Sequence, residues 1–250
     1  FKLYIYTYYK NVKNDNVDIA ICGASEAPLT YTTFSGFCAS RIMSTKNGIP
    51  SKVSCPFDIK RSGGVLSEGA AIVMIEELEH AISRNSPIYA ELLSYARGSG
   101  TNHLNNSSSY NNEIGMDIVM EKAIKQANLH PDNIDYVCAH APSDILLDRI
   151  ETYAIKKVLK DYAYKVPISS IKSMIGNPLA AGGPMQLIAS VMAIQYKTIP
   201  PTINYDDPDP ECDLDYVANN SRNNNIRTVL INSHGIGGSN ASIIVKEYTD

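Results

Sequence analysis

The side chain with the clearest chemical potential is His140, which directly follows the apolar run 134–139. An imidazole at a strand end could donate a hydrogen bond from Nε2 to a substrate oxygen. A histidine that only forms a structural hydrogen bond where the loop begins would give the same local pattern. Glu151 follows eleven residues later, and Lys172 lies further along the chain. By their types alone, this acid and base could form a structural ion pair.

The chain has five cysteines: Cys22, Cys38, Cys55, Cys138 and Cys212. They are scattered, odd in number and free of CxxC spacing, which argues against a disulfide framework or a zinc site and fits a reducing compartment. Cys138 lies two residues before His140, on the same face of the expected strand, so it is the best internal candidate for a nucleophile. Because a buried cysteine is usually inert packing, we do not expect Cys138 to be catalytic.

The composition is that of an ordinary globular protein. Of the 250 residues, 44% are hydrophobic and 19% are charged, and the net charge is −4. This charge offers no electrostatic case for binding nucleic acid or an anionic membrane. No apolar run approaches the roughly 20 residues that a membrane-spanning helix needs. We see no repeat and no linker that would divide the chain into independent domains.

Short apolar runs alternate with longer amphipathic segments along the chain. Strands are expected at 17–22, 70–75, 88–97, 134–139, 166–170, 214–217, 228–231 and 241–246, the first two of them buried. Helices are expected in the Tyr-rich segment before 17 and near 77–84, 117–127, 148–159 and 184–195. The segment 27–56 is expected to be loop with short helical pieces, and the Asn/Ser-rich 101–112 an exposed, mobile loop.

Strands that alternate with helices of this length predict an α/β fold. The sheet is expected to be mixed or parallel and covered by helices on both faces. In such sheets, reactive groups gather on loops at the strand ends. His140 occupies such a position, as does the Gly-rich turn 235–238 between the last two expected strands.

Five motifs in order along the chain resemble the β-ketoacyl-(acyl-carrier-protein) synthase family of the thiolase-like superfamily. They are PFD…R…EGA at 56–70, VCAH at 137–140, SSIKSMIG at 169–176, IPPTIN at 199–204 and NSHGIGGSN at 232–240. Each alone is weak, but together they span almost the whole chain. The resemblance implies a thiolase-like layered α-β-α-β-α sandwich. It places 1–56 at the end of the N-terminal half and 57–250 in the C-terminal half, with the nucleophilic Cys of the family expected upstream of Phe1.

In that family an acyl group on Cys is joined to a carbanion made by decarboxylating a malonyl-thioester. The resemblance assigns His140 as the first catalytic His, a donor to the enolate oxygen. It pairs Glu151 and Lys172 near the active site, either to orient the site and set its electrostatics or as a partly buried structural ion pair. Asn177 stands where the two-His branch has its second His, although related branches use Cys-His-Asn, and an amide NH₂ can donate a hydrogen bond. No cofactor or metal of its own is implied, because phosphopantetheine arrives on the carrier protein.

Two departures from the family weaken the case for condensation. The family reads HGTxT, with two hydroxyls that grip the pantetheine arm, but this chain has Pro142, Ser143 and Asp144 after the His-Ala pair. Proline has neither a hydroxyl nor a backbone donor, Asp144 would place a negative charge in the substrate channel, and Ser143 is at a different position. His234 replaces a gating Phe, either as a substitute for a missing hydrogen-bond donor or, as we expect, by drift in a site no longer selected for condensation. Gly235, Gly237 and Gly238 are expected to let the backbone pass close to the site.

Three functions remain open. The first is a non-condensing, chain-length-factor-like subunit of fatty-acid or polyketide biosynthesis that dimerises with an active ketosynthase. The second is an active condensing enzyme that combines an upstream Cys with His140 and Asn177. The third is a diverged acyl-transferring or scaffold protein of a larger assembly. In each case we expect a cytoplasmic protein that works with acyl carrier protein as a homo- or heterodimer.

Overall fold

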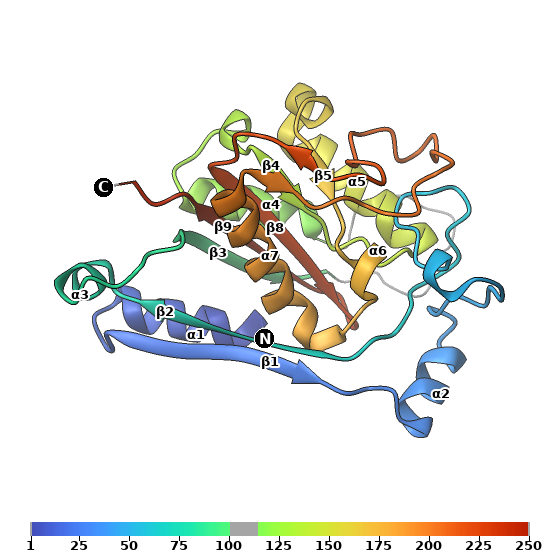
Figure 1. Ribbon diagram of the computed structural model, residues 1–250, viewed down its shortest axis with the longest axis horizontal. Coiled ribbons are helices and arrows are strands. Elements are labelled where there is room, and N and C mark those ends of the chain that lie inside the picture. The colour runs from blue at the N-terminus through green and yellow to red at the C-terminus, as the bar shows by residue number, and fades with distance from the viewer. Residues whose placement is uncertain (1, 101–114, 250) are drawn as a thin grey trace.

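The computed structural model describes residues 2–100 and 115–249, so the loop expected at 101–112 lies outside the described residues. The first part of the chain forms a small layer. Helix α1 (Lys2–Lys13) packs on a two-stranded antiparallel sheet made of β1 (Ile19–Glu26) and β2 (Gly69–Glu76). Helix α2 (Tyr31–Ala39) and the 3₁₀ turn η1 (Pro50–Lys52) lie between these strands in sequence, and α3 (Leu78–Ser83) follows them (Figure 1).

The central sheet has five strands in the order β3-β9-β8-β4-β5. Its strands are β3 (Glu91–Ser99), β4 (Tyr136–Cys138), β5 (Ile168–Ser169), β8 (Thr228–Gly235) and β9 (Ser239–Lys246). Strand β4 runs parallel to both of its neighbours, β5 and β8, whereas β9 pairs antiparallel with β8 and β3. The sheet is therefore mixed, and β4 and β8 end at the same edge.

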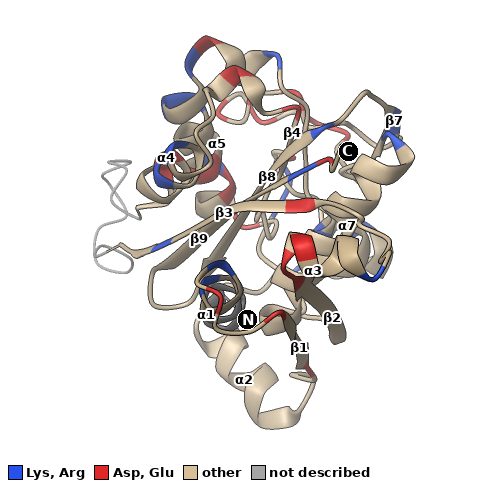
Figure 2. Cartoon of the chain, turned by 90° about the vertical axis from the view of Figure 1, so that its left-hand side faces the viewer, with Lys and Arg blue, Asp and Glu red and all other residues tan. Residues whose placement is uncertain are grey.

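Helices cover both faces of this sheet, because alternate residues of its strands belong to two separate cores. Helices α4 (Met116–Gln126) and α5 (Ile145–Leu159) contribute to the core that contains Val137 and Leu230. Helix α7 (Gly182–Tyr196) contributes to the core that contains Tyr136 and Val229. In Figure 2, α4 and α5 lie on one side of the strands and α7 on the other.

Short elements complete the chain: η2 (Pro131–Asn133), η3 (Lys160–Tyr164), α6 (Lys172–Ile175), η4 (Leu179–Ala181), and the pair β6 (Thr198–Ile199) and β7 (Arg222–Asn223). None of the helices in the described ranges is long and apolar enough to cross a membrane.

Two expectations about strands are wrong. The strands β1 and β2 form, but they are buried on one face only: Ala20 and Cys22 are buried, whereas Ile21 is 67% exposed and Ile72 is 69% exposed. Only one face of this two-stranded sheet packs against other described elements, so the apolar residues on the other face are open. Segment 214–217 is not a strand, because isolated hydrogen bonds to Ile168 and Thr202 replace a ladder and Val217 adopts a positive φ of 47°.

Candidate active site

His140 follows the end of β4, and its backbone is held by a carboxylate from α5. The Oε1 atom of Glu151 accepts a hydrogen bond from the His140 N–H at 2.9 Å, and Oε2 accepts one from the Ala141 N–H at 2.8 Å. Asn232 on β8 donates from Nδ2 to Oε1 of Glu151 at 3.1 Å. All three donors are buried, so one carboxylate fixes the direction in which the chain leaves the sheet at His140.

Lys172, the first residue of α6, reaches His140 from the neighbouring strand end. Its Nζ donates to the backbone oxygen of His140 at 2.5 Å and lies 3.4 Å from Nδ1 of the ring. Burial lowers the pKa of Lys172 to about 8, against the opposing effect of Glu151, so the ammonium form still prevails at pH 7. Since an ammonium group only donates, this contact favours Nδ1 as an acceptor and a ring proton on Nε2. His140 is thereby set as an Nε2–H donor.

The expected pairing of Glu151 with Lys172 takes a different form. No Nζ–carboxylate contact within 4.0 Å joins them; instead, each contacts the backbone of His140. Burial raises the pKa of Glu151, while its hydrogen bonds to Ala141, His140 and Asn232 and the charge of Lys172 act in the opposite direction. The two charges thus act together on one residue, which the order of the motifs alone did not predict.

His234 lies at the end of β8, next to His140. The two ring centroids are 5.9 Å apart with an interplanar angle of 69°. Nδ1 of His234 is 2.7 Å from Oδ1 of Asn240, and the Asn240 amide also donates to the Gly238 carbonyl at 3.3 Å. Because that oxygen only accepts, the His234 proton resides on Nδ1 in the neutral ring. This tautomer argues against His234 as a neutral substitute for the second Nε2–H donor.

Asn177 lies in the loop that follows α6 and is anchored through its backbone. Its N–H donates to the Val65 carbonyl at 2.7 Å, and its carbonyl accepts from the Ser67 N–H at 3.2 Å. The preceding Gly176 has φ of +70°, and a Cβ there would lie 2.8 Å from the Cβ of Ser67. The segment around Ser67 therefore supports the loop that carries Lys172 and Asn177, and only glycine fits at the point of closest approach.

In residues 142–144, which follow His140 closely, the polar side chains form structural hydrogen bonds. Ser143 is fully buried with φ of +71°, and its Oγ accepts a hydrogen bond from the Cys55 N–H at 3.0 Å. Oδ1 of Asp144 accepts from the N–H groups of Leu146 and Leu147 at 2.9 Å each, so Asp144 is the N-cap of α5. Pro142 is buried. No hydroxyl of this segment is exposed toward a ligand, and the carboxylate of Asp144 caps α5.

Asp144→Ala is expected to lower the free energy of unfolding by about 1 kcal/mol, because the first turn of α5 loses its acceptor. Asp144→Thr, which introduces a hydroxyl that can also cap a helix, is expected to cost less. Urea unfolding followed by circular dichroism measures both. Equal losses in the two variants would contradict a capping role.

Gly235, Gly237 and Gly238 form the tight connection between β8 and β9. Gly237 and Gly238 have φ values of +81° and +80°, and the Gly238 N–H donates to the Gly235 carbonyl at 3.1 Å. This hairpin brings Asn240 back opposite His234. Positive φ explains why glycine occupies 237 and 238.

Other residues that sequence reasoning did not single out hold the site together. Thr202 and Asn204, at the end of the IPPTIN motif, bind neighbouring loops: Thr202 Oγ1 accepts from the Ser170 N–H at 3.0 Å, and the Asn204 amide donates to the carbonyls of Ser51 and Ser54. Gln186 on α7 donates to the Ala139 carbonyl at 2.7 Å. The sequence feature that could have pointed to Thr202 and Asn204 is that they are polar residues within a family motif.

Cys138 is fully buried on the α7 side of the sheet, and burial raises the pKa of its thiol. A thiol in that state is a poor nucleophile, which agrees with the expectation of a packing role. Within residues 2–100 and 115–249, no group of three or more side chains is suited to hold a metal ion.

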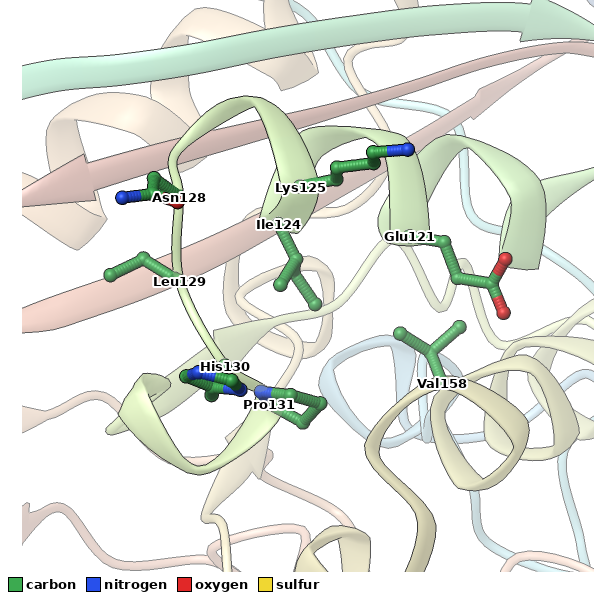
Figure 3. A pocket seen from close by; sticks show the side chains of 8 residues that line it. All are labelled: Glu121, Ile124, Lys125, Asn128, Leu129, His130, Pro131 and Val158. Atoms are coloured by element: carbon green, nitrogen blue, oxygen red, sulfur yellow. The ribbon is translucent and has the colours of Figure 1, made fainter.

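Two hollows in the surface lie away from His140. A cavity of about 270 Å³ opens between α4 and α5, where Ile124 and Val158 point into it beneath a polar rim (Figure 3). A larger groove of about 550 Å³ lies between α1, β3 and α4. His140 lines neither of them.

Comparison with known proteins gives a consistent result. The model of the β-ketoacyl synthase N-terminal domain matches residues 3–81, and that of the C-terminal domain matches residues 89–206. The chain is 40% identical to 3-oxoacyl-[acyl-carrier-protein] synthase 2 of Coxiella burnetii, over 96% of this chain and 57% of the relative. It is also 40% identical to the tetracenomycin polyketide synthase ketoacyl synthase alpha subunit of Streptomyces glaucescens, over 94% of this chain and 54% of the relative.

Solved structures show the same similarity. A type II polyketide synthase acyl-carrier protein in complex with its ketosynthase matches with a TM-score of 0.92 and 35% identity, over 96% of this chain and 59% of that chain. A β-ketoacyl synthase from Burkholderia phymatum matches with a TM-score of 0.90 and 30% identity, over 98% and 58%. The chain thus spans somewhat less than three fifths of the proteins it matches, and the thiolase-like α/β fold is confirmed.

Proposed function

Because this chain belongs to the β-ketoacyl synthase family, we propose that it is part of a ketosynthase-like subunit of fatty-acid or polyketide biosynthesis that no longer condenses acyl chains by itself. The subunit would pair with an active ketosynthase, as a chain-length factor does, and the pair would receive its substrate on acyl carrier protein. We expect it in the cytoplasm and without a cofactor of its own, since the phosphopantetheine arm belongs to the carrier.

The observation that carries this proposal is the state of residues 142–144. Pro142 provides no hydroxyl, the Ser143 hydroxyl is buried against the Cys55 N–H, and the Asp144 carboxylate caps α5. The segment therefore presents no hydroxyl for a pantetheine arm, and it carries a negative charge where the family has a neutral residue. A weakened grip on the arm lowers the occupancy of the productive complex, and with it the rate.

Two of the similar structures support the proposed partners. One match with a TM-score of 0.85 is a ketosynthase/chain length factor pair, and another is a ketosynthase in complex with its acyl-carrier protein. By analogy, a second ketosynthase subunit and a carrier protein are the partners that we propose here.

An active condensing enzyme is the second candidate, and the arrangement around His140 favours it. Glu151 and Lys172 hold the His140 backbone, and Lys172 sets the ring as an Nε2–H donor. The structure gives the side-chain amide of Asn177 no hydrogen bond to the described residues, which leaves an NH₂ group that could act as the second donor. In this reading an upstream Cys would complete a Cys-His-Asn site.

Release of carbon dioxide from malonyl-carrier protein by the full-length protein distinguishes the two functions. The wild type alone is expected to show no release above a protein-free control. The double variant Pro142→Thr/Asp144→Thr restores both family hydroxyls and keeps a capping side chain, so it is expected to gain measurable release if the upstream nucleophile is present. Release by the wild type at the rate of an authentic ketosynthase would overturn the proposal in favour of the second candidate.

A further inference from the structure

We propose that Asn47 and Gly48 form a site of spontaneous covalent modification, at which the Asn47 amide is lost and aspartate and isoaspartate are formed through a cyclic imide. The sequence contains a single Asn-Gly pair. Both residues are exposed, and they lie in the loop between α2 and η1. The modification goes beyond the proposed function, because it uses only the chain and water.

The reaction begins with the backbone nitrogen of Gly48, which gives its proton to a solvent base and attacks Cγ of Asn47. The N–Cγ bond forms, the Cγ–Nδ2 bond breaks, and Nδ2 takes up a proton from solvent and leaves as ammonia. Water then opens the imide at either carbonyl, which gives aspartate or isoaspartate. One amide and one water thus become a carboxylic acid and ammonia, without oxidation or reduction, and the chain gains a negative charge.

The structure leaves the attacking nitrogen and the target side chain unprotected. Neither the Gly48 N–H nor the Asn47 amide has a hydrogen bond within the described part of the chain. A Cβ at Gly48 would have no atom of a non-neighbouring residue within 4 Å, and φ is +150°, a value that favours glycine. Ring closure therefore breaks no hydrogen bond and meets no side chain on Gly48.

The residues on both sides of the pair are anchored. The Ser44 N–H donates to the Gly64 carbonyl at 2.9 Å, and the Ser51 carbonyl accepts from the Asn204 amide at 2.8 Å. The extra backbone atom of isoaspartate would thus fall in the exposed stretch between two fixed points. We expect the modified protein to stay folded, so that the product accumulates and can be analysed.

Other described asparagines that precede a small residue lack one of these properties. The N–H of Ser86, which follows Asn85, is hydrogen-bonded at 2.9 Å. Asn232 is fully buried and its amide is hydrogen-bonded. Asn220 and Ser221 are exposed, but the serine side chain hinders attack by its own nitrogen. Asn220 is therefore the internal reference for the effect of glycine at the following position.

Ageing of the full-length protein at mildly alkaline pH in water enriched in ¹⁸O, followed by mass spectrometry, tests the proposal. Cleavage after arginine in ordinary water releases residues 42–61, in which Asn47 is the single amide side chain. A gain of about 3 Da is expected, since one ¹⁸O enters, whereas modification during handling adds about 1 Da. Fragmentation by electron transfer is expected to show both isoaspartate and aspartate. The gain is expected to be at least about tenfold faster than at Asn220.

Two exchanges and a matched control complete the test. Asn47→Gln is expected to abolish the gain, because the longer side chain needs a larger and slower-forming ring, whereas Asn220→Gln is expected to leave the gain in 42–61 unchanged. Gly48→Ala is expected to slow it about tenfold, with circular dichroism as the check on folding. No ¹⁸O gain in 42–61, an equal rate in Gly48→Ala and wild type, or a product that contains aspartate alone would overturn the proposal. None of these results depends on whether the protein condenses acyl chains.

Discussion

Arg61→Met is expected to lower the free energy of unfolding by about 3–5 kcal/mol, the loss typical of breaking a buried ionic network from one side. The Arg61 side chain is 1% exposed, and its NH1 lies 2.8 Å from Oδ2 of Asp209. Its Nε lies 3.5 Å from Oδ2 of Asp148. Methionine fills a similar volume but leaves the Asp209 carboxylate and the Asp148 carboxyl group without this partner.

Arg61 also satisfies three backbone oxygens, which explains why the fold needs a guanidinium at this position. It donates to the carbonyls of Asp58, Asp144 and Ile145, and so joins the loop after η1 to the start of α5. Burial raises the pKa of Asp148 to about 8, although Arg61 acts in the opposite direction. Loss of Arg61 would raise that pKa further. Above about pH 8, Asp148 ionises in the folded wild type but stays protonated in the folded variant, so the stability that the variant loses relative to the wild type is expected to grow as the pH rises through this range.

Urea unfolding of the full-length protein, followed by circular dichroism, measures this loss. The matched control is Arg84→Met, which removes a bidentate contact with Glu76 at the surface and is expected to have a much smaller effect because solvent screens that pair. Arg61→Lys keeps the charge but lacks the fork, and it is expected to recover only part of the loss. A loss for Arg61→Met no larger than that for Arg84→Met would contradict the proposed network.

Glu151→Ala is expected to lower the free energy of unfolding by about 3 kcal/mol or more. The change leaves the N–H groups of His140 and Ala141 and the Asn232 amide without their buried acceptor, at about 1–3 kcal/mol each before relaxation. It also removes the charge that most supports the ammonium form of Lys172. The pKa of Lys172 is therefore expected to fall below its present value of about 8, so that the group loses its proton nearer to pH 7.

A double-mutant cycle with Lys172→Met separates these effects. If the two charges compensate each other across His140, Glu151→Ala/Lys172→Met is expected to cost less than the sum of the single variants. Glu151→Gln serves as the shape-matched control, since it keeps one acceptor but presents an NH₂ group to another N–H. Additive losses would show that Glu151 and Lys172 act independently.

The position of the imidazole proton of His140 can be measured directly in the wild type and in Glu151→Ala. In the wild type, proton–nitrogen correlation spectra of the imidazole are expected to show the proton on Nε2, because Lys172 donates to Nδ1. In Glu151→Ala this preference is expected to weaken as Lys172 loses its charge. A proton on Nδ1 in the wild type would contradict the arrangement described for the site.

The sequence determined the elements and the end of the sheet at which the site lies. Helices α4, α5 and α7 follow from amphipathic or apolar periodicity, and His140 follows an apolar run whose length favours a short strand. The resemblance to the family placed Lys172 near His140, and the structure shows how they meet, because β4 and β5, the strands before them, are parallel neighbours. The motif order then predicted the family, which is confirmed. The catalytic roles of these residues stay predictions.

Sequence patterns were less informative about short segments, because their secondary structure and burial depend on the residues packed around them. The apolar run 214–217 reads as a strand, but no continuous ladder forms beside it, and Val217 turns away with positive φ. The runs in β1 and β2 suggested burial, although only one face of that sheet is covered by described elements. Burial is a property of neighbours, and a run of four to eight residues does not specify them.

The tertiary structure alone decided what the polar residues of the site do. The resemblance to the family placed Glu151 and Lys172 near His140, but only the packing of α5 and α6 against the end of β4 directs both of them to its backbone rather than to each other. Likewise, the acid at 144 could have been recognised as a helix cap, whereas the burial of the Ser143 hydroxyl against the Cys55 N–H depends on a contact between segments 88 positions apart. Sequence specifies local preference and periodicity, while hydrogen-bond partners of buried groups are chosen by whichever distant backbone the fold brings within reach.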